Sequence, residues 1–189
     1  MKRVAIMLGE GFEEIEALTT ADVLRRAKIE CDLVSVKEEY VKGAHDIIIK
    51  SDKIVGNDLK DYDMIVCPGG MPGAENLAKC SILIDVIKEF NNMNNKYIAA
   101  ICASPAVVLS KAEITKDRYI TSYPGEEFEG ILEDSNYVEE LVVVDGNLIT
   151  SRGPATTLLF AYKLVDILGG NSENLKNGML WNMLEEEKE

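Results

Sequence analysis

Short apolar runs alternate with helical patterns along most of this chain. The apolar, largely β-branched runs lie at residues 3–8, 31–36, 62–70 and 96–102, and the helical patterns lie at residues 13–27, 73–94, 104–113 and 155–170. Strands with so few polar residues are typical of a parallel sheet that is covered on both faces, and helices between parallel strands supply that cover. The alternation therefore predicts an α/β protein with a mainly parallel sheet and helices on both faces.

Four weaker patterns complete this prediction. Residues 45–52 and 118–124 indicate further strands, residues 138–151 a hairpin that turns at Asp145-Gly146, and residues 172–186 a terminal helix. The helix at 73–94 is expected to break near Cys80. Because the sequence contains no internal repeat and no linker-like stretch, we expect one domain over residues 1–189.

Charge and hydropathy exclude several classes of function. The chain of 189 residues carries 33 acidic and 20 basic residues, a net charge of -13. Such a chain repels phosphates, which argues against sequence-independent nucleic-acid binding and against an anionic membrane surface. No window approaches the roughly 18 apolar residues of a membrane span, and the apolar start ends at Gly9. We expect a cytoplasmic protein with no membrane partner.

The residues that bind metals and cofactors are sparse. The four cysteines, Cys31, Cys67, Cys80 and Cys102, show no CxxC spacing, and His45 is the single histidine. A Cys/His zinc site is therefore not expected, and the cysteines should be thiols in the cytosol. The G-x-G after the first strand lacks the third glycine of a dinucleotide site, since Glu14 stands there. The sequence predicts no metal and no cofactor.

Three loops should meet at the carboxyl edge of the sheet, where parallel α/β proteins place their functional groups. They are residues 9–16, 68–73 and 102–105. In the third loop Cys102 precedes Ser104, a good N-cap, and Pro105, which suits the first helical position. The start of a helix favours a thiolate. On this stretch alone, Cys102 is either a reactive thiol or a small buried hydrophobe.

The other two loops offer groups that could serve such a thiol. Gly69 and Gly70 expose backbone N–H groups that could receive an oxyanion, although a glycine-rich stretch is also an ordinary turn. Among Glu13, Glu14 and Glu16, two acids are accounted for by the helix dipole, while one that faces Cys102 could stay protonated and bind a thiolate. Helical geometry does not select which one. The histidine reads as a surface or interface residue.

Together the loops resemble the DJ-1/PfpI superfamily, and most closely its DJ-1/ThiJ branch. The matching stretches are GFEEIEA (11–17), DVLRRA (22–27), PGGMPGAENL (68–77), AAICASP (99–105) and TSRGPATTLLFA (150–161). The resemblance implies a flavodoxin-like three-layer α/β sandwich, similar to class I glutamine amidotransferases, and a homodimer. It further implies that residues 150–156 lie close to the pocket and to the dimer region.

The resemblance also assigns roles to individual residues. It implies that Cys102 is the reactive cysteine and Glu16 its protonated partner, that the backbone N–H groups of Gly70 and Ala103 bind an oxyanion, and that Gly69 and Tyr123 line the pocket. Tyr123 stands where the family's fuller constellation has a histidine. Ala103 replaces the histidine that follows the cysteine in the protease-like branch, and no histidine lies downstream. Peptidase and glutaminase activities therefore lose their base.

Two functions agree with this constellation. The first is enzymatic chemistry on 2-oxoaldehydes such as methylglyoxal, in which a Cys102 hemithioacetal leads to glyoxalase or protein deglycase activity in a stress response. The missing histidine predicts slow turnover. The second is a non-enzymatic peroxide sensor or redox-regulated chaperone, in which Cys102 is oxidised to a sulfinate that Glu16 stabilises. An inert cysteine on a plain scaffold is the third reading.

Overall fold

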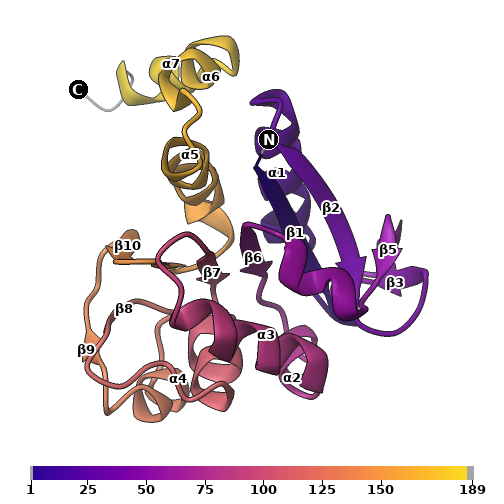
Figure 1. Ribbon diagram of the computed structural model, residues 1–189. Coiled ribbons are helices and arrows are strands. Elements are labelled where there is room, and N and C mark those ends of the chain that lie inside the picture. The colour runs from indigo at the N-terminus through magenta and orange to yellow at the C-terminus, as the bar shows by residue number, and fades with distance from the viewer. Residues whose placement is uncertain (1, 187–189) are drawn as a thin grey trace.

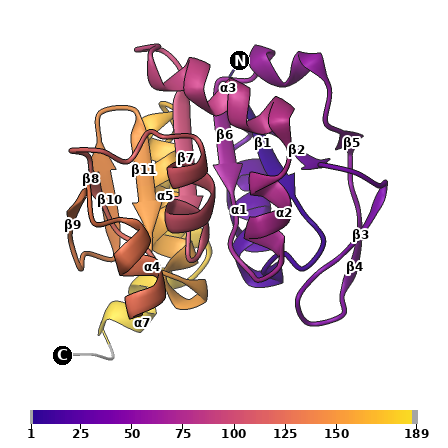
Figure 2. The ribbon, with the colours of Figure 1, turned by 90° about the horizontal axis from the view of Figure 1, so that it is seen from below.

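The structure is a computed structural model that describes residues 2–186. A seven-stranded sheet forms the middle layer of the protein (Figures 1 and 2). The strand order is β10 (Val142–Asp145), β11 (Leu148–Ser151), β7 (Tyr97–Ile101), β6 (Met64–Cys67), β1 (Arg3–Leu8), β2 (Glu30–Ser35) and β5 (Lys53–Ile54). All neighbours pair in parallel except β10 and β11, which form the predicted hairpin.

Helices cover both faces of this sheet. On one face lie α1 (Glu14–Arg26) and α5 (Thr157–Ile167), and on the other lie α2 (Gly73–Ala78), α3 (Ser81–Asn91) and a π-helical segment (Pro105–Leu109). Figure 2 shows α2 and α3 in front of the sheet, with α1 and α5 behind it. The predicted flavodoxin-like three-layer sandwich is therefore confirmed.

Strand β1 shows why both faces need a cover. Its alternate side chains Val4, Ile6 and Leu8 enter the core beneath α1 and α5, while Ala5 and Met7 enter the opposite core. All five are fully buried. Side chains of a strand point alternately to the two faces, so a run of apolar residues without alternation requires two cores.

The remaining elements are short and lie around this core. They are β3 (Tyr40–Lys42), β4 (Ile48–Lys50), a 3₁₀ turn (Asn57–Asp61), β8 (Tyr119–Ile120), α4 (Glu126–Ile131), β9 (Asn136–Tyr137), a second 3₁₀ turn (Pro154–Thr156), α6 (Ser172–Gly178) and α7 (Trp181–Glu186). Every helix within the described residues is too short or too polar to span a membrane.

Three predicted elements differ from the structure. The strand expected at 45–52 is reduced to β4, which pairs with β3 outside the main sheet, and the strand expected at 118–124 is reduced to β8, which pairs with β9. The terminal helix is two helices, because Leu180 adopts a left-handed φ of +61° between them. By contrast, the expected break near Cys80 is confirmed, since α2 ends at Ala78 and α3 begins at Ser81.

The order of the central strands brings the three loops together. Strands β7, β6 and β1 are neighbours, with Cys67 opposite Ala100 and Val66 opposite Ile6. Their carboxyl ends therefore lie side by side at one edge of the sheet. The loops that follow them are residues 9–13, 68–72 and 102–104, which contain most of the residues predicted for the site.

Candidate active site

Cys102 stands on a strained turn directly after β7. Its φ is +64°, in the left-handed region that costs a residue with a side chain about 1–2 kcal/mol. The turn is fixed from two sides: the Cys102 N–H donates to the Ser151 carbonyl at 3.1 Å, and the Tyr123 N–H donates to the Cys102 carbonyl at 2.8 Å. Strain that surrounding contacts maintain in this way is characteristic of functional positions.

The helix after the turn begins differently from the prediction. Ser104 was expected to cap it, but Ser104 itself has helical angles, φ -65° and ψ -34°, and makes no capping hydrogen bond. Its hydroxyl instead donates to the Pro68 carbonyl and ties the cysteine turn to the glycine loop. Pro105 does occupy the start of the helix, as predicted. Ser104 therefore stands at the N-cap position, as predicted, but its side chain does not cap the helix because its hydroxyl binds the Pro68 carbonyl.

Glu16 is the acid that faces Cys102. It lies in the first turn of α1, and its side chain is fully buried. The Gly69 N–H donates to Glu16 Oε2 at 2.7 Å. Burial raises the pKa of Glu16 to about 7, against the opposing effect of hydrogen bonds with Gly69 and Cys102. At neutral pH this carboxyl group is therefore protonated in a large fraction of molecules.

The Cys102 thiol is partly buried and receives two backbone donors. Burial and the negative charge of an ionised Glu16 raise the pKa of Cys102 to about 12, while N–H groups of Gly70 and Ala103 act in the opposite direction. The sequence led us to expect a lowered pKa from the helix start alone. That expectation is wrong while Glu16 is ionised, because burial and the neighbouring charge outweigh the two donors.

The glycine loop is shaped to let these groups approach. A Cβ at Gly69 would lie 2.5 Å from Cys102 Cβ and 2.9 Å from Glu16 Oε2. Gly70 has a φ of +85°, and a Cβ there would lie 2.4 Å from the Gly11 carbonyl oxygen. Gly69 is therefore restricted to glycine by the side chains of Cys102 and Glu16, and Gly70 by neighbouring backbone atoms and its positive φ.

Adding one methyl group at Gly69 tests this packing. We expect Gly69→Ala to lower the free energy of unfolding by about 1–3 kcal/mol, because the new Cβ overlaps Cys102, and to slow alkylation of Cys102 by iodoacetamide. Urea denaturation and mass spectrometry of the alkylated protein measure the two effects. Gly130→Ala in α4 is the control, since nothing lies within 4 Å of a Cβ there. Equal stability of the two variants would contradict the packing argument.

Tyr123 and His45 make their contacts with groups other than the Cys102 sulfur. Tyr123 contacts the Cys102 turn through its backbone, and its half-exposed ring packs edge-on against Phe128 at a centroid distance of 6.1 Å. His45 is bound to Glu14, with Nδ1 at 2.8 Å from Glu14 Oε2. It is exposed, in agreement with the surface location predicted for it.

Two contacts that hold the site were missed at the sequence level. The Ser151 carbonyl fixes the Cys102 turn, and the Ser104 hydroxyl links it to the glycine loop. A backbone carbonyl leaves no mark on the sequence, and Ser104 already had a plausible local role. The expectation that residues 150–156 lie close to the pocket agrees with the place of Ser151.

A cysteine on a strained strand-to-helix turn, at the carboxyl edge of a flavodoxin-like sheet, defines a class of α/β proteins that display a thiol beside a buried acid. A sequence model described as the DJ-1/PfpI family matches residues 2–167. The chain therefore belongs to the DJ-1/PfpI family.

Several DJ-1 proteins are among the relatives of this chain. The chain is 36% identical to Protein dj-1beta of Drosophila melanogaster, over 91% of its own length and 92% of the relative's. The crystal structure of Drosophila melanogaster DJ-1beta superposes with a TM-score of 0.88, over 95% of this chain and 97% of that chain. The chain is 33% identical to the Glutathione-independent glyoxalase DJ-1 of Schizosaccharomyces pombe, covering 88% and 91% of the two lengths. The chain spans only 40% of Protein DJ-1 homolog B of Arabidopsis thaliana, with 35% identity over 92% of itself.

Proposed function

We propose that this protein is a DJ-1-like, cysteine-dependent stress-response protein that converts small 2-oxoaldehydes such as methylglyoxal into 2-hydroxy acids. One observation carries the proposal: a thiol, a buried carboxyl group with a pKa near 7, and two backbone N–H donors converge on Cys102. These are the nucleophile, the proton carrier and the oxyanion site that addition to an aldehyde requires.

Cys102 and Glu16 act as one titrating pair in this proposal. The pair loses its first proton near pH 7, and the remaining proton is shared between sulfur and oxygen. When that proton is on Glu16, Cys102 is a thiolate hydrogen-bonded to a carboxylic acid. The N–H groups of Gly70 and Ala103 favour this arrangement, since they bind negative charge on the sulfur.

The reaction then follows from the positions of these groups. The thiolate attacks the aldehyde carbon, a C–S bond forms, and the aldehyde oxygen takes the proton of Glu16 to give a hemithioacetal. The hydrogen on that carbon leaves as a proton and the neighbouring carbonyl carbon gains one, which yields a 2-hydroxy thioester without net oxidation. Water hydrolyses the thioester, releasing the 2-hydroxy acid and regenerating Cys102. No cofactor enters this sequence.

The relatives support this choice of substrate. The Schizosaccharomyces pombe relative is described as a glutathione-independent glyoxalase, and the chain covers most of its length. Removal of the same adducts from protein side chains, a deglycase reaction, would use the same hemithioacetal. With Tyr123 at the position of the family histidine, we expect slow turnover. Because Ala103 stands where the protease-like branch has a histidine and no histidine lies downstream of Cys102, we propose neither peptidase nor glutaminase activity.

The test is the conversion of methylglyoxal to lactate by the purified protein, followed enzymatically and by NMR without glutathione. We expect lactate from the wild type and none above the uncatalysed rate from Cys102→Ala or Glu16→Ala. Retained circular dichroism spectra show that the variants are folded. Lactate production that persists in Cys102→Ala would contradict the proposal.

A second candidate function is a peroxide sensor or redox-regulated chaperone. It is favoured by Tyr123, which leaves the site without a histidine base that turnover would use, whereas oxidation of a thiolate needs none. Cys102 is partly exposed, whereas Cys31 and Cys67 are buried. If Cys102 is the first thiol that dilute peroxide oxidises to a sulfinate while no lactate forms, this function replaces the enzymatic one.

We also propose that the protein forms a homodimer in the cytosol. Ile15, Ile47 and Ile48 are about half exposed or more, and Ile47 lies next to the start of α1 through a contact with Glu14. Exposed apolar residues gathered in this way suit a protein interface. Ile48→Lys is expected to shift the mass measured by light scattering from dimer towards monomer, whereas Ile131→Lys on α4 should leave it unchanged.

A further inference from the structure

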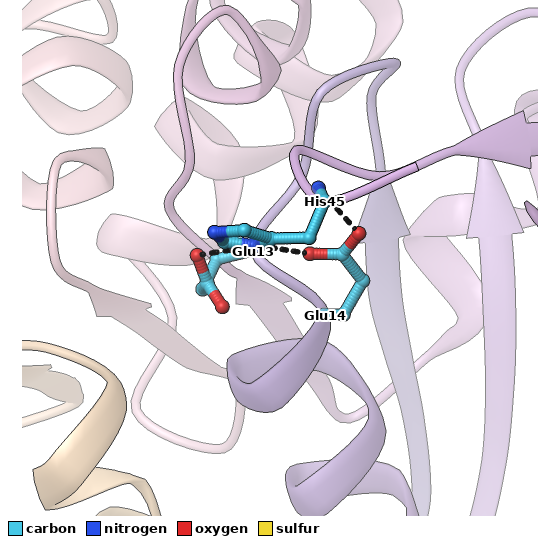
Figure 3. Close-up of side chains that lie close together, drawn as sticks. All are labelled: Glu13, Glu14 and His45. Atoms are coloured by element: carbon cyan, nitrogen blue, oxygen red, sulfur yellow. Dashed lines mark hydrogen bonds and ion pairs between the residues drawn. The ribbon is translucent and has the colours of Figure 1, made fainter. Parts of the chain in front are cut away.

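Glu13, Glu14 and His45 form a cluster separate from the Cys102 site (Figure 3). Glu13 and Glu14 lie at the start of α1, and His45 lies on the turn between β3 and β4. Figure 3 shows the imidazole ring between the two carboxylates. His45 Nδ1 is 2.8 Å from Glu14 Oε2 and 3.7 Å from Glu13 Oε2, and the three donor atoms lie within 4.8 Å of one another.

The two carboxylates differ in how they are satisfied. Glu14 Oε1 accepts from the backbone N–H groups of His45 and Ile47, at 2.7 and 3.4 Å, and Oε2 contacts the His45 ring. Glu13 is 9% exposed, and its carboxylate accepts no hydrogen bond from any residue in the described part of the chain. The contact of Glu13 Oε2 with His45 Nδ1, at 3.7 Å, is an ion pair too long for a hydrogen bond, so one imidazole faces two carboxylates. Glu13 Oε2 points to the same space as the other two donors.

We propose that Glu13, Glu14 and His45 bind a divalent first-row transition ion such as Zn²⁺. One imidazole nitrogen and two carboxylate oxygens are ordinary ligands for such ions. This inference does not depend on the function proposed for Cys102.

The distances suit such an ion. Donors bound to zinc at about 2.0–2.1 Å stand roughly 3.3 Å apart in tetrahedral geometry. The two distances from His45 Nδ1, 2.8 and 3.7 Å, lie on either side of that value, so small side-chain rotations bring the three atoms onto one face of a coordination sphere. The remaining positions are open to water or to an exogenous ligand. The ion takes the place of the proton between Nδ1 and Glu14, which is released to solvent.

Charge and access agree with the geometry. Two carboxylates and a neutral imidazole carry a charge of -2, which a divalent cation cancels, so that no net charge is left buried. In the single chain the His45 side chain is 67% exposed, which gives the ion a path from solvent. The helix dipole explains why acids lie at the start of α1, but it requires neither their burial nor a histidine between them. The sequence predicted no metal because the cysteines and the histidine lack the spacing of a zinc site. That argument did not cover ligands that the fold brings together from the start of α1 and from the turn between β3 and β4.

Titration of the chelator-stripped full chain with ZnCl₂, followed by calorimetry, tests the proposal in the oligomeric state in which the protein is purified. We expect one site per chain, and about a tenfold or larger loss of affinity in Glu13→Gln and in His45→Asn. Cys102→Ser and Glu38→Gln should keep the wild-type affinity, since Glu38 is exposed and lies outside the cluster. With Co²⁺ as the probe, the absorption should lack the sulfur-to-metal charge-transfer band that thiolate ligation produces.

Two results would overturn this inference. One is unchanged zinc affinity in both Glu13→Gln and His45→Asn. The other is loss of binding in Cys102→Ser together with a thiolate charge-transfer band, which would assign the metal to the cysteine site. Glu13→Gln keeps the shape of the side chain, so it remains informative if His45→Asn disturbs the turn.

Discussion

Cys102→Ala is expected to abolish both lactate formation and rapid reaction with iodoacetamide. The Cys102 thiol lies where Glu16 and the N–H groups of Gly70 and Ala103 converge, so its removal takes away the proposed nucleophile. The rate of lactate formation should fall to that of the uncatalysed reaction. The measurement is a steady-state assay with methylglyoxal, in parallel with mass spectrometry of the alkylated cysteines.

The strained backbone at Cys102 also leads to an expectation for the free energy of unfolding. With φ at +64°, position 102 favours glycine over any residue with a Cβ. Cys102→Gly should therefore be more stable than Cys102→Ala by about 1 kcal/mol in urea denaturation, the reverse of the usual order for buried sites. This order would show that the backbone at position 102 is strained for any residue with a Cβ, as expected at a functional position.

Cys80→Ser is the matched control for both measurements. Cys80 is also partly exposed, but it lies before α3, away from Glu16. Its loss should leave lactate formation and the labelling of Cys102 unchanged. If Cys80→Ser removed the activity and Cys102→Ala did not, the assignment of the nucleophile would be wrong.

The fold could be predicted because its signals are local. Strands β1, β6 and β7 are apolar on both faces, and this pattern predicts a parallel sheet between two layers of helices. The short strands outside the main sheet were predicted less accurately. β4 and β8 pair with partners outside the main sheet, a choice that depends on contacts between distant segments and not on the pattern of either segment.

The sequence predicted which residues form the site, but it did not predict the pKa of the Cys102 thiol. The residues of the three loops alone left open which acid faces Cys102, and only the family resemblance selected Glu16, which lies beside it in the structure. The sequence did not reveal that burial outweighs the helix start at Cys102, because burial depends on the packed structure. Nor did it connect His45 with Glu13 and Glu14, which are about thirty positions away in the chain.

Glu16→Gln is expected to change how stability depends on pH as well as to abolish turnover. Burial raises the pKa of Glu16 from its ordinary 4.5 to about 7 in the folded protein. The folded state therefore binds this proton more tightly than the unfolded state, and the stability that the proton confers is complete below pH 4.5 and is lost as pH rises through 7. The loss amounts to about 3 kcal/mol, since one pKa unit corresponds to about 1.4 kcal/mol.

A glutamine at position 16 keeps an acceptor for the Gly69 N–H but has no proton to lose. Its free energy of unfolding should exceed that of the wild type by about 2–3 kcal/mol at pH 8 and match it at pH 4.5, in urea titrations with a chelator present. The proton that leaves near pH 7 belongs to the Cys102–Glu16 pair, so this window is that of the pair.

Glu14→Gln provides a control of opposite sign. Although burial opposes it, the hydrogen bonds from His45 and Ile47 hold the pKa of Glu14 below its usual value. Glu14 therefore stabilises the fold at neutral pH and loses this effect as pH falls through its folded pKa, so Glu14→Gln should be less stable than the wild type at pH 7, with a deficit that shrinks in acid. If both variants changed stability in the same direction at pH 8, Glu16 would not be the protonated acid on which the proposed proton transfer depends.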